Sequence, residues 1–235
     1  MKKLIAFSIL NITFLISFSQ DCTKNTQFVK GSVITTTSYN EKDKVTGSSK
    51  ATCTSVTTSG TSVTANIKSE GFDKDGKATS TGEFTITCGN GKIVMDIRSM
   101  TAGQTEIFKG STMTMEGDNM EIPENLTIGQ SLPDAKVKMT FSKDGSTTGT
   151  MDILIKNRKV ESKENITTSA GTFECYKISY DVESSIGLAM MANMQMKSAS
   201  KCVMYYNAEN GSIKTENYNE KGKMISYTLV TEIKK

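Results

Sequence analysis

A cluster of methionines near the C-terminal end is the feature of this sequence that most suggests a ligand-binding surface. The chain has 14 methionines among 235 residues, and five fall close together: Met190, Met191, Met194, Met196 and Met204. If residues 187–197 form a strand, alternate side chains share one face, and Leu188, Met190, Met194 and Met196 all point to it. Flexible thioethers fill irregular space and repack around different guests. We therefore predict that these four residues line a concave face that binds an apolar small molecule, an acyl chain or an envelope protein.

Two other interpretations of the methionines remain open. They could be ordinary core packing, or their soft thioether sulfurs could select Cu(I). Met113 and Met115, from the first half of the chain, could contribute to the same surface. Because copper binding is only weakly supported, we predict no metal site and no cofactor.

The chain lacks the residues that most hydrolases need. It contains no histidine and no tryptophan. Without imidazole, no serine or cysteine nucleophile can be activated by His, and no His metal site can form. We predict that the protein is not an enzyme and has no catalytic residues.

Three motifs that resemble catalytic or phosphate-binding motifs lack their required context. Ser198 and Lys201 have the SxxK spacing of penicillin-recognising enzymes, but the SDN and KTG partners do not occur. The stretch 88–92 lacks the glycine spacing of a phosphate-binding loop. A histidine-free hydrolase with paired carboxylates is the competing hypothesis, although spacing identifies no pair among Glu116, Asp118, Glu121 and Glu124. A structural or adhesive envelope module is a third possibility.

Five cysteines are candidates for disulfide bonds: Cys22, Cys53, Cys88, Cys175 and Cys202. Chain order suggests Cys22 or Cys53 with Cys88, and Cys175 with Cys202, but spacing does not decide the connectivity. At least one thiol stays unpaired in a monomer. Lipid attachment at Cys22 would require a small apolar run before it, and Ser19-Gln20-Asp21 is not one.

The first nineteen residues have the form of an export signal. Lys2 and Lys3 precede an apolar run from Leu4 to Phe18, and small residues follow at 17 and 19. The run is too short and too polar to span a bilayer comfortably. We predict cleavage after Ser19, and an extracytoplasmic protein, periplasmic or secreted, that does not span the membrane.

The mature chain is weakly charged. The formal net charge of +3 falls by two when Lys2 and Lys3 are removed, and no segment concentrates basic residues. We therefore predict no nucleic-acid partner.

Strand patterns dominate the mature chain. Apolar and polar residues alternate over 63–67, 84–88, 137–141, 176–182 and 225–229, and no long helical period occurs. Turn dipeptides separate the runs at Asn90-Gly91, Asp144-Gly145 and Asn210-Gly211. We predict a mainly β protein with an antiparallel, curved sheet or sheets, or an open half-barrel, and little helix beyond the signal peptide.

A short phrase with an aromatic residue, a polar turn and lysine occurs three times, at 39–44, 72–77 and 218–223. Each copy joins two strand-like runs and predicts a hairpin. Asp73 and Asp75 could instead be calcium ligands, but the other carboxylates of a calcium loop are missing.

Both prolines fall between residues 121 and 133. Proline removes a ladder donor, so this stretch should cross between sheets or halves. We place a boundary near residue 120, which gives β halves over 20–120 and 121–235. One continuous, strongly curved sheet interrupted by a crossover is the alternative.

Several of these phrases, in their order along the chain, resemble exported β proteins of Bacteroidetes-type bacteria grouped as the TapB or DUF3108-like family. They are Asp21-Cys22, 72–77, 126–132, 170–178 and 218–223. Where that family places a tryptophan and a glycine-rich turn, this chain has Tyr205, Tyr206 and the stretch 207–211. The resemblance implies an antiparallel, curved β architecture and an uncharacterised role, and it supplies no catalytic residues.

Overall fold

The computed structural model describes residues 22–95, 112–189 and 195–235, so the predicted signal peptide lies outside it. Short 3-10 helices, η1 (Cys22–Lys24) and η2 (Thr26–Phe28), precede the strands. All strands then belong to a single antiparallel sheet. This confirms the predicted mainly β, curved antiparallel fold. No helix in the described ranges is long and apolar enough to cross a membrane.

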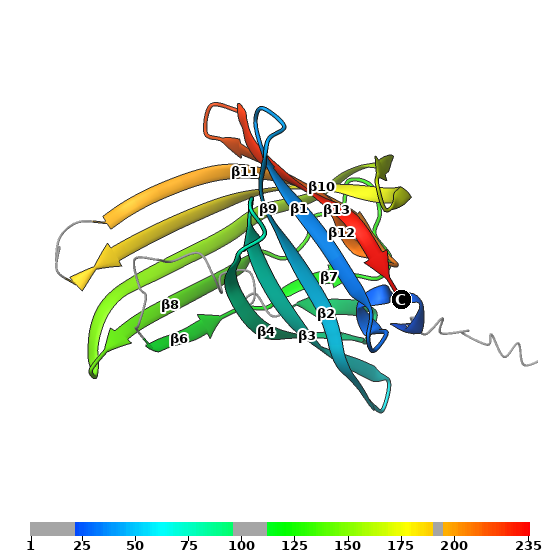
Figure 1. Cartoon of the computed structure of the whole chain (residues 1–235), viewed down its shortest axis with the longest axis horizontal. Coiled ribbons are helices and arrows are strands. Elements are labelled where there is room, and N and C mark those ends of the chain that lie inside the picture. The colour runs from blue at the N-terminus through cyan, green and yellow to red at the C-terminus, as the bar shows by residue number, and fades with distance from the viewer. Residues whose placement is uncertain (1–21, 96–111, 190–194) are drawn as a thin grey trace, which may run out of the picture.

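The sheet has thirteen strands in the described residues, and consecutive strands are mostly neighbours. The strands are β1 (Val33–Asn40), β2 (Val45–Ser59), β3 (Ser62–Asp73), β4 (Ala78–Gly89), β5 (Lys92–Met95), β6 (Thr112–Gly117), β7 (Met120–Pro123), β8 (Ala135–Lys143), β9 (Ser146–Thr168), β10 (Gly171–Leu188), β11 (Gln195–Asn207), β12 (Gly211–Asn219) and β13 (Met224–Lys234). Their spatial order is β6-β8-β9-β10-β11-β12-β13-β1-β2-β3-β4-β5-β7. Strands β6 and β8 to β11 extend away from the others as a long curved arm (Figure 1).

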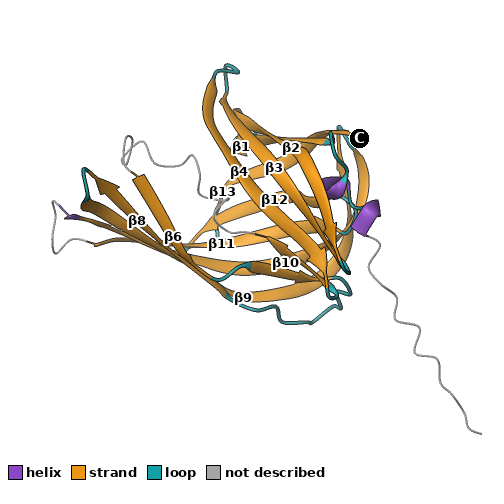
Figure 2. Ribbon diagram, turned by 90° about the horizontal axis from the view of Figure 1, so that it is seen from below, coloured by secondary structure: helices purple, strands orange, loops and turns teal. Residues whose placement is uncertain are grey.

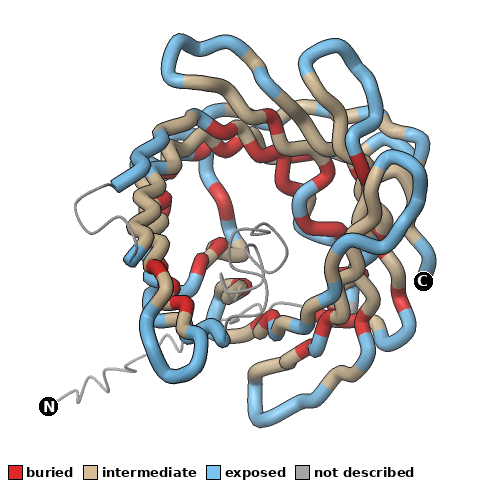
Figure 3. The backbone as a smooth tube through the Cα atoms, turned by 60° about the vertical axis from the view of Figure 1, so that its left-hand side comes forward, coloured by how far each residue is buried: buried red, intermediate tan, exposed pale blue. Residues whose placement is uncertain are grey.

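The two edge strands of the sheet are consecutive in sequence. β6 pairs with β8 at one edge, β7 pairs with β5 at the other, and only Asp118 and Asn119 separate them. The backbone N–H of Asp118 still donates to the carbonyl of Lys136, at 2.8 Å. One segment therefore reaches both ends of the sheet, and the sheet curls round into a ring (Figure 3).

The curl gives the arm an inner face, defined here as the side of β8 to β10 that packs against β5 and β7. Val137, Met139 and Ile155 belong to one buried cluster with Met120 of β7, and Met95 of β5 packs against it. Buried and exposed residues alternate along β8, as expected when a strand has one covered face and one wet face. The opposite side of the arm is its outer face.

The predicted strand runs and hairpins are confirmed. The five alternating runs lie in β3, β4, β8, β10 and β13. In the β4–β5 and β8–β9 turns, Asn90-Gly91 and Asp144-Gly145 have positive φ at both residues. Two successive positive φ values match the twist of a two-residue hairpin, which is why these dipeptides occur there.

The thrice-repeated phrase forms the same turn each time. The side-chain oxygens of Asn40, Asp73 and Asn219 each accept the backbone N–H groups of the second and fourth following residues. The third following residue has positive φ in every copy. Asp73 therefore acts as a turn former, and the described residues contain no group of three or more His, Cys, Asp or Glu suited to a metal.

The proline-bracketed stretch connects β7 to β8 and hydrogen-bonds through its backbone to residues 158–160 of β9. Its Leu126 and Leu132 pack with Val160 and Ile178 in a buried cluster. Arg158, 2% exposed, holds both ends of the crossing: its guanidinium donates to the carbonyls of Pro133, at 2.7 Å, and Glu121, at 3.1 Å. The single curved sheet is thus the arrangement observed, while the division into halves at residue 120 stays a prediction.

The N-terminal segment closes one end of the roll, where η1 and η2 lie (Figure 2). Cys22 is disulfide-bonded to Cys88 of β4. Thr26 donates through its hydroxyl to Asn210, at 2.7 Å, and through its backbone N–H to the carbonyl of Glu209, at 2.7 Å. The first residues of the described chain are therefore tied to two distant parts of the sheet.

The second suggested disulfide, Cys175 with Cys202, is wrong, because both thiols are free and buried. The register places Cys202 opposite Tyr180, five residues along β10 from Cys175. Five residues of strand span about 17 Å, and an odd number of residues puts side chains on opposite faces. Cys53 is also a free, buried thiol.

The disulfide should contribute strongly to stability because it closes a loop of sequence separation 66. We expect Cys88→Ser to lower the free energy of unfolding by about 2–4 kcal/mol. Urea denaturation with and without reductant measures this. Reductant should shift the midpoint of the wild type and leave that of Cys88→Ser unchanged; a wild-type midpoint that ignores reductant would contradict the assignment.

Arg158 should be needed to hold the crossing segment. Arg158→Met removes the charged donor to the carbonyl oxygens of Pro133 and Glu121 and should lower the free energy of unfolding by about 2–4 kcal/mol. Its exposed neighbour gives the matched control, since Lys159→Met should change stability by about 0.5 kcal/mol or less. Equal effects of the two substitutions in thermal denaturation would rule out this role.

Candidate functional site

Methionines from four strands line up across the inner face of the arm. The backbone register places Met115 of β6 opposite Met139 of β8, and Met139 opposite Met151 of β9. The row continues from Met151 to Ile186 of β10, and from Ile186 to Met196 of β11. A second row beside it contains Met113, Phe141 and Leu188. We call these eight side chains the methionine face.

The methionine face is covered at its centre and exposed at its margins. Met139 and Phe141 are 1% and 3% exposed. Met115, Met151, Ile186 and Leu188 are half-buried against the same cluster. Met113 on β6 and Met196 on β11 are 40% and 44% exposed, which is high for large apolar side chains.

The structure brings together two of the four predicted binding residues. Met196 lies opposite Ile186, two residues before Leu188, so Leu188 and Met196 share the inner face. The prediction that they belong to one strand is wrong: Leu188 ends β10, Met196 lies in the antiparallel β11, and the chain reverses between them. Met190 and Met194 lie outside the described residues. Met139, Met151, Phe141 and Ile186 were missed because only the strand register reveals their alignment.

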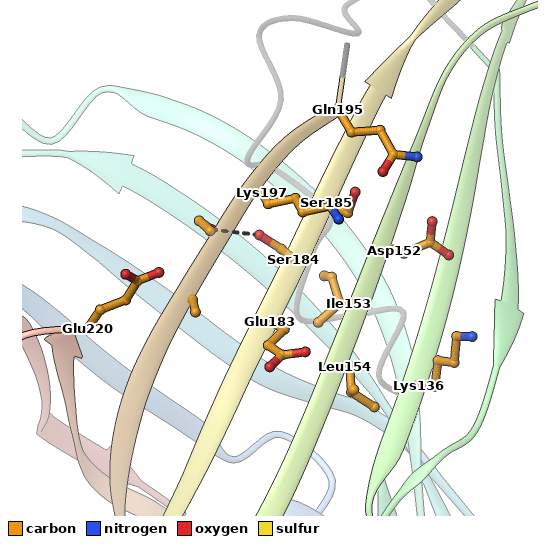
Figure 4. A pocket seen from close by; sticks show the side chains of 12 residues that line it. Lys136, Asp152, Ile153, Leu154, Glu183, Ser184, Ser185, Gln195, Lys197 and Glu220 are labelled. Carbon is orange, nitrogen blue, oxygen red and sulfur yellow. Dashed lines mark hydrogen bonds between the residues drawn. The ribbon is translucent and has the colours of Figure 1, made fainter. Parts of the chain in front are cut away.

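The outer face of the arm has a hollow of different chemistry. This hollow, of about 540 Å³, is lined mainly by charged and polar side chains, among them Lys136, Asp152, Glu183, Lys197 and Glu220 (Figure 4). A smaller hollow of about 250 Å³ shares Glu183 and Glu220. Both hollows contain lysines as well as carboxylates, so their lining differs in chemistry from the methionine face.

The residues of two motifs considered for catalysis do not come together in the structure. Ser198 and Lys201 lie three residues apart on β11, so their side chains point to opposite faces of the sheet. Glu121 forms an ion pair with Lys92, at 2.6 Å. Neither Glu121 nor its neighbours Glu116, Asp118 and Glu124 line the two hollows.

The free thiols are shielded from reaction. Burial raises the pKa of Cys175 to about 11, with a smaller contribution from Glu174. Burial also raises the pKa of Cys53 and of Cys202. A buried thiol that stays protonated near neutral pH is a poor nucleophile.

Residues 29–230 match the family model described as DUF3108-like. The chain belongs to the DUF3108-like family. Among curated protein sequences, none matches this chain.

Two solved structures share the fold of this DUF3108-like protein. A candidate exported protein with a YmcC-like fold from Bacteroides fragilis is 20% identical, with a TM-score of 0.71 over 88% of this chain and 97% of the other. A candidate lipoprotein from Parabacteroides distasonis is 20% identical, with a TM-score of 0.72 over 90% of this chain and 98% of the other. The likeness covers nearly the whole of both chains and concerns the fold.

A buried carboxylate in the sheet of this DUF3108-like protein is held by hydrogen bonds and an ion pair. Glu216 of β12 is 9% exposed and accepts hydrogen bonds from Tyr218, at 2.7 Å, and Tyr205, at 3.4 Å, beside an ion pair with Lys214 at 2.6 Å. Burial alone would raise the pKa of Glu216, but Lys214 and Tyr218 outweigh it and lower the pKa. A satisfied carboxylate of this kind stabilises the sheet.

This lowered pKa predicts a pH dependence of stability. Ionised Glu216 stabilises the folded state at pH values above its unfolded pKa, and the stabilisation is lost as the pH falls through its folded pKa. The free energy of unfolding of Glu216→Gln should therefore change less than that of the wild type between about pH 6 and about pH 3. Glu220→Gln, in an exposed turn, is the control and should follow the wild-type curve.

Proposed function

We propose that this is an extracytoplasmic, non-enzymatic protein that binds an elongated apolar ligand, such as an acyl chain, on the methionine face. The observation that carries the proposal is the in-register row from Met115 to Met196 across five strands. Neighbouring strands lie about 4.8 Å apart, so the row spans about 19 Å. That length suits a long hydrocarbon chain lying across the strands.

The exposure pattern supports binding over simple core packing. A core closes over its apolar side chains, whereas Met113 and Met196 at the two margins of this face keep 40% and 44% of their surface exposed. Thioethers are flexible and polarizable, so a surface built from them adapts to chains of different shape. A ligand lying along the row would cover both margins and remove this apolar surface from water.

Export is supported by the predicted signal peptide, by the disulfide and by the similar proteins. Disulfides persist in oxidising compartments outside the cytoplasm. One similar structure is that of a candidate exported protein and another that of a candidate lipoprotein. In this chain the sulfur of Cys22 is bonded to Cys88, so it is not available for a lipid thioether. We therefore favour release after signal cleavage over lipid anchoring.

The experiment tests the exposed margins of the methionine face, because substitutions there should leave the core intact. Met113→Gln combined with Met196→Gln should weaken binding of a fluorescent fatty-acid probe roughly tenfold, since two apolar contacts are lost. Ile225→Gln is the matched control, because Ile225 on β13 is 43% exposed and lies outside the face. Native mass spectrometry and lipid extraction of the purified protein should reveal a bound molecule.

The proposal fails if the purified protein carries and binds no apolar molecule, or if the paired variant and the Ile225→Gln control bind the probe equally. Turnover in a glycan and ester substrate screen, abolished by changing one carboxylate among 116, 118, 121 and 124, would favour the hydrolase instead.

A further inference from the structure

We infer that the ligand is an amphiphile with an uncharged, hydroxyl-bearing head, of the monoacylglycerol type, whose head lies on the serines of β10 and β11. This inference rests on the proposed function, because it assigns the tail to the methionine face. It adds the chemistry of the head and the residues that hold it.

The polarity of the inner face changes one row away from the methionines. The next row runs in register from Val137 and Ile153 to Ser184 and Ser198. The row after it runs Ala135, Ile155, Val182, Ser200 and Asn219. On β8 and β9 both rows are aliphatic, whereas on β11 and β12 they carry hydroxyls and an amide. The inner face is therefore apolar at one side and polar at the other.

The polar side carries two separate groups of hydrogen-bonded side chains. The hydroxyls of Ser184 and Ser198 lie 2.8 Å apart. In the row beyond Ser200, the thiol of Cys202 donates to the amide oxygen of Asn217, at 3.2 Å, and the amide N–H of Asn217 donates to the hydroxyl of Ser226, at 3.1 Å. We call Ser184, Ser198, Ser200, Cys202, Asn217 and Ser226 the polar belt.

The polar belt keeps capacity for a ligand. A serine hydroxyl has one donor and two acceptor positions, and the Ser184–Ser198 contact uses only part of them. Ser198 is exposed, and Ser184 and Ser200 are half-buried, so hydroxyl groups of a ligand can reach all three.

The charges of the arm exclude a charged head. Lys136, Asp152, Glu183 and Lys197 alternate with the inner residues of their strands and line the outer hollow. On β10 and β11, the inner positions from 176 to 188 and from 196 to 206 carry no charged side chain. Arg158 is 2% exposed and already donates to two carbonyls. Beside these serines, the described residues of the inner face thus offer a carboxylate or phosphate no cation to offset its desolvation, which is costly.

The spacing allows one molecule to reach both parts. Met196 and Ser198 are two residues apart on β11 and share the inner face. Two residues of strand span about 7 Å, which is within the reach of a glycerol ester head joined to an acyl chain.

The experiment compares heads on one tail, using the full mature protein with its disulfide. Monooleoylglycerol, oleate and oleoyl-lysophosphatidylcholine are titrated below their aggregation concentrations and followed by displacement of a fluorescent apolar probe. The wild type should bind monooleoylglycerol about tenfold more tightly than the anionic oleate or the zwitterionic oleoyl-lysophosphatidylcholine. The double variant Ser184→Ala, Ser198→Ala should lose about tenfold in monooleoylglycerol affinity and keep its affinity for oleate.

Ser185→Ala is the matched control, because Ser185 follows Ser184 on β10 and its side chain therefore points to the opposite face of the sheet; it should bind like the wild type. An unchanged denaturation midpoint in the double variant shows that folding is intact, and Ser198→Ala alone, at an exposed position, serves if the midpoint moves.

Charged and uncharged ligands that bind equally, or a double variant that binds monooleoylglycerol like the wild type, would overturn the uncharged-head assignment and leave the methionine face standing as a tail site. Absence of probe binding by the wild type would overturn the proposed function together with this inference.

Discussion

The pairing of one short segment with both ends of the sheet is the constraint on which this architecture depends. The segment from Thr112 to Pro123 supplies both edge strands, because its first half pairs with β8 and its second half with β5. The unpaired N–H and C=O groups of each edge therefore belong to this one segment. The short gap between the halves forces the sheet to curl, and the curl creates an inner face. Pro123, which cannot donate to a ladder, sits at the outer edge, where no donor is needed.

Three different groups of residues pack on the inner face of the sheet. The N-terminal segment packs on the cluster that contains Cys53 and Cys88, and the crossing segment packs through Leu126 and Leu132. The arm receives less cover, because Met120 and Met95 reach only its centre. Met113 and Met196 on the arm keep 40% and 44% of their surface exposed, and single apolar side chains are exposed elsewhere too, such as Ile128 and Ile225. The binding role proposed above would use the two exposed methionines that share the inner face.

Local sequence patterns predicted the strands and turns, but they did not predict which strands pair or in which register. The alternation over 137–141 marked a strand with one buried face, and Asn90-Gly91 marked a tight turn, since both effects act over a few residues. The alignment of Met139 with Met151 depends on the register between strands, which no short window contains. The same limit explains the error over Leu188 and Met196, whose shared face comes from pairing between two strands. Cys175 and Cys202 were misjudged because proximity in sequence says little about distance across a sheet.

The pairing of the first strand with the last has a consequence for how the molecule is made. Val33 of β1 lies opposite Lys234 of β13, so the sheet lacks its central pairing until the C-terminus is present. A chain crossing a membrane N-terminus first would have to wait, unfolded or partly folded, until translocation ends. Contacts between residues so distant in sequence also slow folding. Chaperones outside the cytoplasm that shield unpaired strands would act during this interval, and proteolysis would compete with completion of the roll.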